Sequence, residues 1–247
     1  MGMEIYIILL FGMVVLITHF LEGITGFGCT VLALPFCIML VGIKAAVPVL
    51  VILAWILALY IVIIAFKDIV WREYLRIIIF VGLGLPAGIF FFNKLPAGIL
   101  TRILGVFMVL VSIRGLYISF KGQKVDKEGG KQGNLARLLL LLGGMVHGAS
   151  GSGGPFVVIY AAKALASKNN FRATLCLVWL TLNSVIIVQN IVNGAITASM
   201  IRLLLWCLPF LAVGMFLGNI AHKKIKDNSF TKIVYMVLLL SGIFTLR

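Results

Sequence analysis

The stretch GASGSGGP, residues 148–155, decides the fold because it interrupts an apolar run that extends from residue 135 to residue 165. A second stretch, GITGFG at residues 23–28, interrupts the apolar run of residues 5–41 in the same way. Glycine lowers the stability of a helix interior and permits sharp turns of the backbone. The sequence therefore predicts two broken helical segments, one near the start of the chain and one beyond its middle.

The composition places the whole chain in a membrane. Of its 247 residues, 62% are hydrophobic and only 11% are charged, and the mean hydropathy is +1.19. A soluble domain of this size cannot bury so much apolar surface, so we expect a polytopic membrane protein without a separate soluble domain. We expect no signal peptide, because the first apolar run follows Glu4 rather than Lys or Arg.

The net charge of +14 fits the same setting. Lys and Arg gather in cytoplasmic loops beside anionic lipid, so this charge indicates a lipid bilayer rather than nucleic acid as the partner. The four cysteines lie in apolar segments without the spacing of metal ligands, and we interpret them as small hydrophobic side chains. We expect no bound metal and no cofactor.

The chain divides into two similar halves within one transmembrane domain. Residues 1–120 form the first predicted repeat, residues 121–134 a polar cytoplasmic linker, and residues 135–247 the second repeat. A shift of about 125 residues superimposes the two glycine stretches, as expected of an internal repeat. Apolar segments are expected at residues 5–21, 29–41, 45–66, 75–92, 97–120, 135–146, 155–165, 171–191, 200–221 and 230–246.

Two membrane topologies fit the short pairs of segments that flank each break. Each pair forms either one broken helix that crosses the bilayer or a re-entrant hairpin that enters and leaves on one side. Four crossings per half would divide the 21 Lys and Arg almost evenly, whereas three crossings place 16 of them on one side. The positive-inside rule therefore favours the hairpins.

An odd number of crossings per half inverts the second repeat relative to the first, as in many transporters. We therefore predict an all-α polytopic membrane protein of two inverted repeats, each with a re-entrant or broken helical hairpin plus three transmembrane helices. In the plasma membrane, both termini are expected outside. The hairpins then open from opposite faces, and their tips meet near the midplane of the bilayer.

The two tips carry groups that suit an anion. After each turn a new half-helix begins, and its first N–H groups lack intrahelical partners and carry the positive end of the dipole. Thr25, Ser150 and Ser152 can add hydroxyl donors, and Pro155 suits the first turn of the second half-helix. Small residues also let membrane helices pack closely, which is the alternative interpretation.

Three ionisable residues adjoin the tips. Glu22 and His147 each precede a glycine stretch, and His19 lies one helical turn before Glu22. Ionisable groups inside a membrane are costly and usually functional, so these three are candidates for carrying a coupling proton. The alternative is that they face water at a hairpin mouth or bond a neighbouring helix.

Asn183 and Gln189 lie with Asn190 on a polar strip of the segment 171–191. They are further candidates for substrate binding, with hydrogen bonding between helices as the alternative. The sequence shows no metal-spaced cluster, paired carboxylates, G-x-S-x-G motif or nucleotide-binding loop, so we do not expect an enzyme. Transport without a nucleotide-binding domain would use an ion gradient or run passively.

The motifs resemble a known family. GITGFG, the following apolar run with Pro35 and the segment Lys44-Ala45-Ala46-Val47-Pro48 are similar to the first half of the TauE/SafE, or sulfite exporter, family. The pattern GxxxGxxGxGGP at residues 144–155, with FRAT at 171–174, resembles that family's second repeat. The resemblance covers nearly the whole chain. It implies export or exchange of small sulfur-containing anions such as sulfite or sulfoacetate, linked to a proton gradient. The motif residues that it carries over are Gly23, Thr25, Gly26, Gly28, Ser150, Gly151, Ser152, Gly153 and Gly154.

The sequence thus favours a secondary transporter that holds its anion between the two tips and works by alternating access between the repeats. One alternative is a membrane assembly subunit whose glycines only pack helices, and another is an anion channel. The sequence leaves open the substrate, the direction of transport, the coupling ion and the oligomeric state, for which a homodimer is one arrangement.

Overall fold

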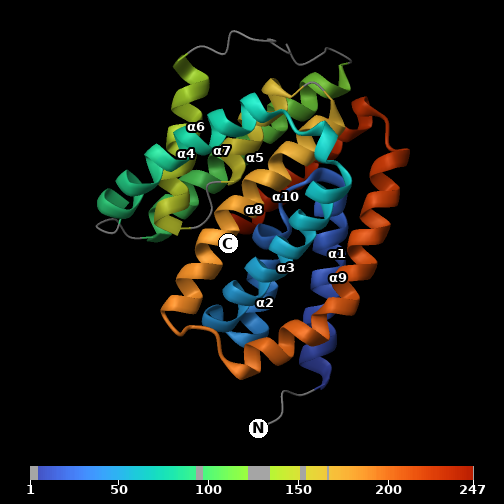
Figure 1. Ribbon diagram of the computed structural model, residues 1–247. Helices are drawn as coiled ribbons and strands as arrows, with labels where there is room; N and C mark the ends of the chain where they lie inside the picture. The colour runs from blue at the N-terminus through green and yellow to red at the C-terminus, as the bar shows by residue number, and fades with distance from the viewer. Residues whose placement is uncertain (1–4, 93–96, 122–133, 151–153, 166, 247) are drawn as a thin grey trace. The chain divides into compact units, whose positions relative to one another are not determined.

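The computed structural model describes residues 5–92, 97–121, 134–150, 154–165 and 167–246. The secondary structure of these residues is entirely helical, with ten α-helices, one short 3-10 helix and no strand among them (Figure 1). The α-helices are α1 (Ile5–Thr25), α2 (Cys29–Val41), α3 (Ile43–Ile64), α4 (Trp71–Phe92), α5 (Ala97–Phe120), α6 (Asn134–Ser150), α7 (Gly154–Ala164), α8 (Lys168–Val192), α9 (Ala198–Lys224) and α10 (Asp227–Thr245).

The apolar runs of the sequence account for these helices. Every predicted segment is helical, and α2 and α5 begin and end at the predicted residues. The other ends differ from the prediction by at most four residues. Apolar character marks the part of a helix that faces lipid or protein, whereas the ends are set by capping and can extend into polar sequence.

Among the described residues, four helices, α1, α3, α8 and α9, are long and apolar enough to cross a bilayer. Large apolar side chains such as Met39, Ile63 and Leu110 are exposed on the chain. Such exposure is costly in water, whereas the hydrocarbon of a bilayer covers apolar side chains without that cost. The structure therefore supports a multi-pass membrane protein.

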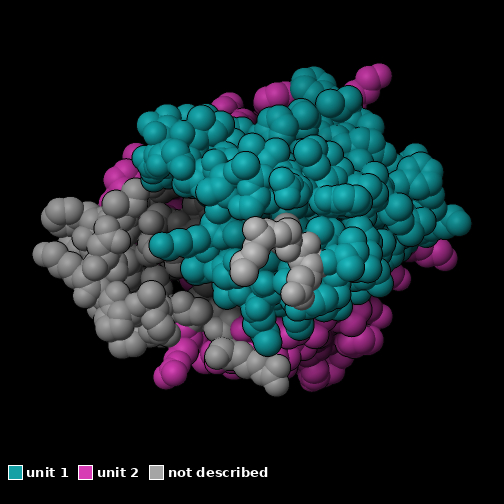
Figure 2. All heavy atoms as spheres, turned by 90° about the horizontal axis from the view of Figure 1, so that it is seen from below, with its two compact units in different colours: residues 1–66, 176–225 teal, residues 67–175, 226–247 magenta. Residues whose placement is uncertain are grey.

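The chain forms two compact units, drawn in teal and magenta in Figure 2. Unit 1 comprises residues 1–66 and 176–225, and unit 2 comprises residues 67–175 and 226–247. In unit 1, α1 packs along α9, with α2 and α3 beside them. In unit 2, α4 packs along α6, α5 packs along α10, and α7 packs on α6. Each unit thus takes helices from both predicted repeats.

Glycines bring the backbones of α1 and α9 close together in unit 1. A Cβ atom added at Gly214 would lie 2.6 Å from the Leu16 carbonyl oxygen, and one at Gly218 would lie 2.7 Å from that of Phe20. Both contacts advance by four residues in the same direction, so the two helices run parallel. Only glycine lets two helices approach this closely.

This parallel register places the first break beside the C-terminal part of α9. Ile24 lies level with His222, because the ring of His222 donates to the carbonyl oxygen of Ile24 over 2.7 Å. The apolar part of α9 lies between Arg202 and His222, so the break is about 15 Å from its middle at 1.5 Å per residue. The predicted position of the two tips near the midplane of the bilayer stays a prediction.

Candidate functional site

The first break is shorter than the sequence indicates. Helix α1 continues through Gly23 to Thr25, and the non-helical residues are only 26–28. Gly26 and Gly28 have φ angles of 81° and 102°, in the left-handed region that side chains other than glycine disfavour. The expected break from Gly23 onward is therefore corrected, because Gly26 N–H still donates to the Glu22 carbonyl oxygen and prolongs the helix.

Gly23 has a packing role. A Cβ atom added there would lie 3.1 Å from the Cα atom of Gly218 on α9, which is tighter than ordinary side-chain contact. Among the residues assigned to the substrate site from sequence, Gly23 therefore serves the contact between α1 and α9. Gly26 and Gly28 remain in the break itself.

Three side chains hold the backbone carbonyl groups at the break. Thr25 Oγ1 donates to the Phe27 carbonyl over 3.0 Å, and Trp179 Nε1 of α8 donates to that of Gly26 over 3.0 Å. His222 Nδ1 of α9 donates to the Ile24 carbonyl, so this nitrogen of His222 carries a proton. A non-helical turn inside apolar surroundings needs such partners, because unsatisfied carbonyl groups are costly there.

Glu22 caps the helix on the far side of the break. Its Oε2 accepts the N–H of Cys29, the first residue of α2, over 2.8 Å. The Glu22 side chain is buried, with 3% exposed. A carboxylate at this place is favourable because it satisfies an N–H group without an intrahelical partner and lies at the positive end of the helix dipole. The α2 N-terminus therefore suits an anion, and the carboxyl group of Glu22 occupies it.

His19 lies one turn before Glu22 and is fully buried. Its Nδ1 donates to the Val15 carbonyl oxygen over 2.9 Å. Its Nε2 has no hydrogen-bond partner among the described residues. Because residues three apart share one face of a helix, His19 and Glu22 lie on the same side of α1.

The second break is described only at its two ends. Helix α6 ends at Ser150 and α7 begins at Gly154, with Pro155 in the first turn, as the sequence predicts. Gly151, Ser152 and Gly153 lie outside the described residues. The backbones of His147 and Ser150 belong to α6, and their side chains are likewise outside the description. The predicted roles of these residues stay predictions.

In unit 2, a polar cluster that the sequence did not indicate ties α7 to α4. The Tyr160 hydroxyl of α7 donates to Glu73 Oε2 over 2.5 Å, and Arg76 Nη1 contacts Glu73 Oε1 at 2.8 Å. Arg76 also donates to the Tyr160 hydroxyl over 3.2 Å. Tyr160 is almost fully buried, so this cluster fixes the half-helix that leaves the second break.

The remaining predicted residues lie on α8. Asn183 is partly buried, whereas the Gln189 side chain is exposed. On the same helix, Trp179 contacts the first break. Spacing could not have identified Trp179 or His222, because their partners lie 153 and 198 residues away along the chain.

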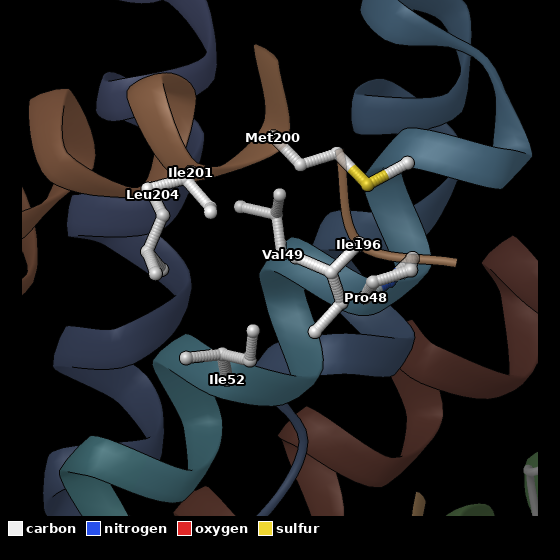
Figure 3. A pocket seen from close by; sticks show the side chains of 7 residues that line it. All are labelled: Pro48, Val49, Ile52, Ile196, Met200, Ile201 and Leu204. Atoms are coloured by element: carbon white, nitrogen blue, oxygen red, sulfur yellow. The ribbon is translucent and has the colours of Figure 1, made fainter. Parts of the chain in front are cut away.

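One described pocket of unit 1 does not suit an anion. It is lined by apolar side chains, as Figure 3 shows, and none of them offers a polar donor. The lining residues are Pro48, Val49, Ile52, Ile196, Met200, Ile201 and Leu204. Because an anion needs hydrogen-bond donors once it leaves water, the break is the better candidate in this unit.

Comparison with known proteins gives one match. The family model described as Sulfite exporter TauE/SafE matches residues 10–245, which is nearly the whole chain. No curated protein and no solved structure matches the chain.

Proposed function

The chain belongs to the sulfite exporter TauE/SafE family, and on this basis we propose that it is a secondary transporter that exports a small sulfur-containing anion such as sulfite or sulfoacetate. The family implies transport of sulfite-type anions across a membrane. The four long apolar helices fit that setting. The choice among sulfur-containing anions, the export direction and the secondary mechanism are our proposal.

The single observation that carries the proposal is the capped N-terminus of α2. There the buried carboxylate of Glu22 accepts the Cys29 N–H, within an apolar unit and next to a glycine turn. A helix N-terminus that bonds a carboxyl group has the kind of donor that an anion of similar size requires. Sulfite and sulfonate groups carry oxygen acceptors that the same N–H groups can bond.

The packing of the helices supports alternating access between two repeats. With the predicted repeats superimposed, α1 corresponds to α6 and α4 corresponds to α9. The extensive contact of α1 with α9 in unit 1 then has its equivalent in the contact of α6 with α4 in unit 2. In each pair, a helix of one repeat packs against a helix of the other repeat, as expected when both repeats have the same fold. Rocking of one repeat against the other is the common mechanism of transporters built from such repeats.

The remaining parts of the proposal concern energy and location. A proton gradient drives transport, with Glu22, His19 and His147 as the candidate carriers, and the protein has no enzymatic activity. It lies in the plasma membrane with both termini outside. Because a proton is taken up together with the anion, transport should accelerate when the proton concentration is higher on the side that the anion leaves, and slow when it is higher on the other side.

The test is transport by purified protein in liposomes loaded with labelled sulfite or sulfoacetate, with and without an imposed proton gradient. We expect efflux, and we expect it to accelerate when the proton concentration is higher inside the liposomes than outside. Ser152→Leu should abolish efflux while the thermal unfolding temperature stays at its wild-type value. Ser199→Leu, at an exposed serine beside the N-cap of α9, is the control and should transport normally. Absence of transport in the wild type, or unfolding of Ser152→Leu, would favour an assembly subunit whose glycines only pack helices.

A further inference from the structure

One face of α5 stays exposed in unit 2. Val106, Leu110 and Ile113 lie on it, with 48%, 63% and 54% of their surface exposed. The opposite face packs along α10, and its residues Met108 and Ser112 are buried. Residues three and four apart share one face of a helix, so the three exposed side chains form a continuous apolar stripe. On a membrane protein, such a stripe is covered by lipid hydrocarbon or by another protein.

The apolar stripe ends in basic and aromatic side chains. Arg114, Tyr117 and Lys121 continue it at spacings of three and four residues, and Phe120 lies beside them at the last residue of α5. Tyr117 and Phe120 are 59% and 68% exposed. Arg114 and Lys121 are exposed as well. Lys232 of α10 reaches the same place, because its Nζ lies 4.4 Å from the centre of the Phe120 ring. We call these five residues the basic-aromatic end of α5.

Two aromatic rings hold cations at this end without neutralising them. Lys121 Nζ lies 4.5 Å from the centre of the Tyr117 ring, and this contact and that of Lys232 with Phe120 have the geometry of cation–π pairs. An aromatic ring carries no formal negative charge. In the part of the chain that the structure describes, no salt bridge involves these cations, although Asp227 lies five residues before Lys232 on α10. The positive charges at the end of the apolar stripe are therefore left for an anion from outside the described chain.

We propose that the basic-aromatic end of α5 binds the headgroup of an anionic phospholipid, whose acyl chains lie along the apolar stripe of the same helix. This inference is independent of the proposed transport function. Arginine and lysine both donate to phosphate oxygens. Tyrosine is typical of the membrane boundary, and lysine stems extend along apolar surface so that the charge reaches the headgroups. Because α5 leads into a linker that is expected in the cytoplasm, the lipid belongs to the cytoplasmic leaflet, whose anionic lipids attract Lys and Arg.

Two other occupants fit this surface less well. A second copy of the chain, related by two-fold symmetry, would bring its own Arg114, Lys121 and Lys232 to the same interface, and like charges repel. A small soluble anion would pair with the cations but leave the apolar stripe uncovered. An anionic phospholipid matches both parts, because it joins a negative headgroup to hydrocarbon chains.

The test is a titration of phospholipid into the purified, delipidated protein in detergent at low salt, with bound lipid counted by native mass spectrometry. The probes are phosphatidylglycerol, which is anionic, and phosphatidylcholine, which is zwitterionic, with the same acyl chains. We expect the wild type to bind phosphatidylglycerol more tightly. The triple variant Arg114→Gln/Lys121→Gln/Lys232→Gln should raise the Kd for phosphatidylglycerol by about fivefold per cation removed, or about 100-fold in all. Tyr117→Leu/Phe120→Leu stays apolar but loses the ring faces, and should raise it by about two- to fivefold for each ring.

The matched control is Lys67→Gln/Arg72→Gln/Lys224→Gln, which removes one exposed arginine and two exposed lysines elsewhere on the expected cytoplasmic side and should bind like the wild type. An equal loss in both triple variants would overturn the inference, because net charge alone would then attract the lipid. Equal affinity of the wild type for the two lipids would overturn it as well.

Two further results would assign the surface to another occupant and contradict the inference. Glycerol phosphate that competes with phosphatidylglycerol at equal concentration would indicate a soluble anion. A dimer that releases phosphatidylglycerol as it forms would indicate a second copy of the chain. Thermal unfolding checks that each variant is folded. Should the first triple variant not fold, the preference of the wild type for phosphatidylglycerol and its reduction in Tyr117→Leu/Phe120→Leu decide the matter.

Discussion

Gly218 on α9 offers a test of the close contact between α1 and α9. The substitution Gly218→Ala adds a Cβ atom 2.7 Å from the Phe20 carbonyl oxygen and 2.9 Å from the Gly23 Cα atom. Both partners are backbone atoms, so relief requires α1 to move by about 0.5–0.7 Å as a whole to reach ordinary contact. Overpacking of this kind costs about 1–3 kcal/mol.

The magnitude must be separated from helix propensity, because alanine stabilises a helix interior by about 1 kcal/mol relative to glycine. Gly82→Ala on α4 is the matched control, since an added Cβ atom there meets no atom within 4 Å. It should be neutral or slightly stabilising. We therefore expect Gly218→Ala to be less stable than Gly82→Ala by about 1–3 kcal/mol.

Thermal unfolding of the purified proteins in one detergent measures this difference. For a chain of this size, about 1 kcal/mol corresponds to a Tm shift of roughly 2–4 °C, so the two variants should differ by about 2–12 °C. Transport should fall as well, because displacement of α1 moves the first break away from Trp179 and His222. Equal Tm values for the two variants would refute the close parallel contact of α1 with α9.

Three further substitutions test the two breaks. Gly28→Ala places a side chain at φ 102° and should lower stability by about 1–2 kcal/mol, and an unchanged Tm would argue against the left-handed turn. Trp179→Phe keeps an aromatic ring but leaves the Gly26 carbonyl without its indole donor, so we expect a loss of about 1–3 kcal/mol, measured by denaturant unfolding. Tyr160→Phe removes the hydroxyl bonded to Glu73, so the free energy of unfolding should fall by a similar amount and the Tm with it. A Tm equal to that of the wild type would mean that this cluster does not fix α7.

The helices could be predicted from sequence because each one is a continuous apolar run bounded by glycine, proline or charge. The end of α1 was misplaced, since the sequence GIT looks like a break although Gly23 and Thr25 continue the helix. A glycine next to a helix end is read as a turn when local sequence is the only guide. In the structure Gly23 is held helical and close to Gly218, a neighbour that the local sequence does not reveal.

The candidate site was predicted only in part. Glu22 was recognised as unusual from its charge in an apolar run, but its partner, the Cys29 N–H seven residues ahead, depends on the angle between α1 and α2. The position of the break along α9 was also beyond local sequence, because it follows from the register of α1 against a helix almost 200 residues later. Charge bias in loops constrains which ends share a side of the membrane, and it contains no information about such registers.

The partners of the first break have a consequence for biosynthesis. The carbonyl groups of Gly26 and Ile24 are bonded by side chains that the ribosome adds 153 and 198 residues later. Until α8 and α9 have entered the bilayer, these two carbonyls must rely on water or on the insertion machinery for their hydrogen bonds. The joint between α1 and α2 is therefore completed late, and truncated chains that lack α9 should leave it hydrated and open to proteases.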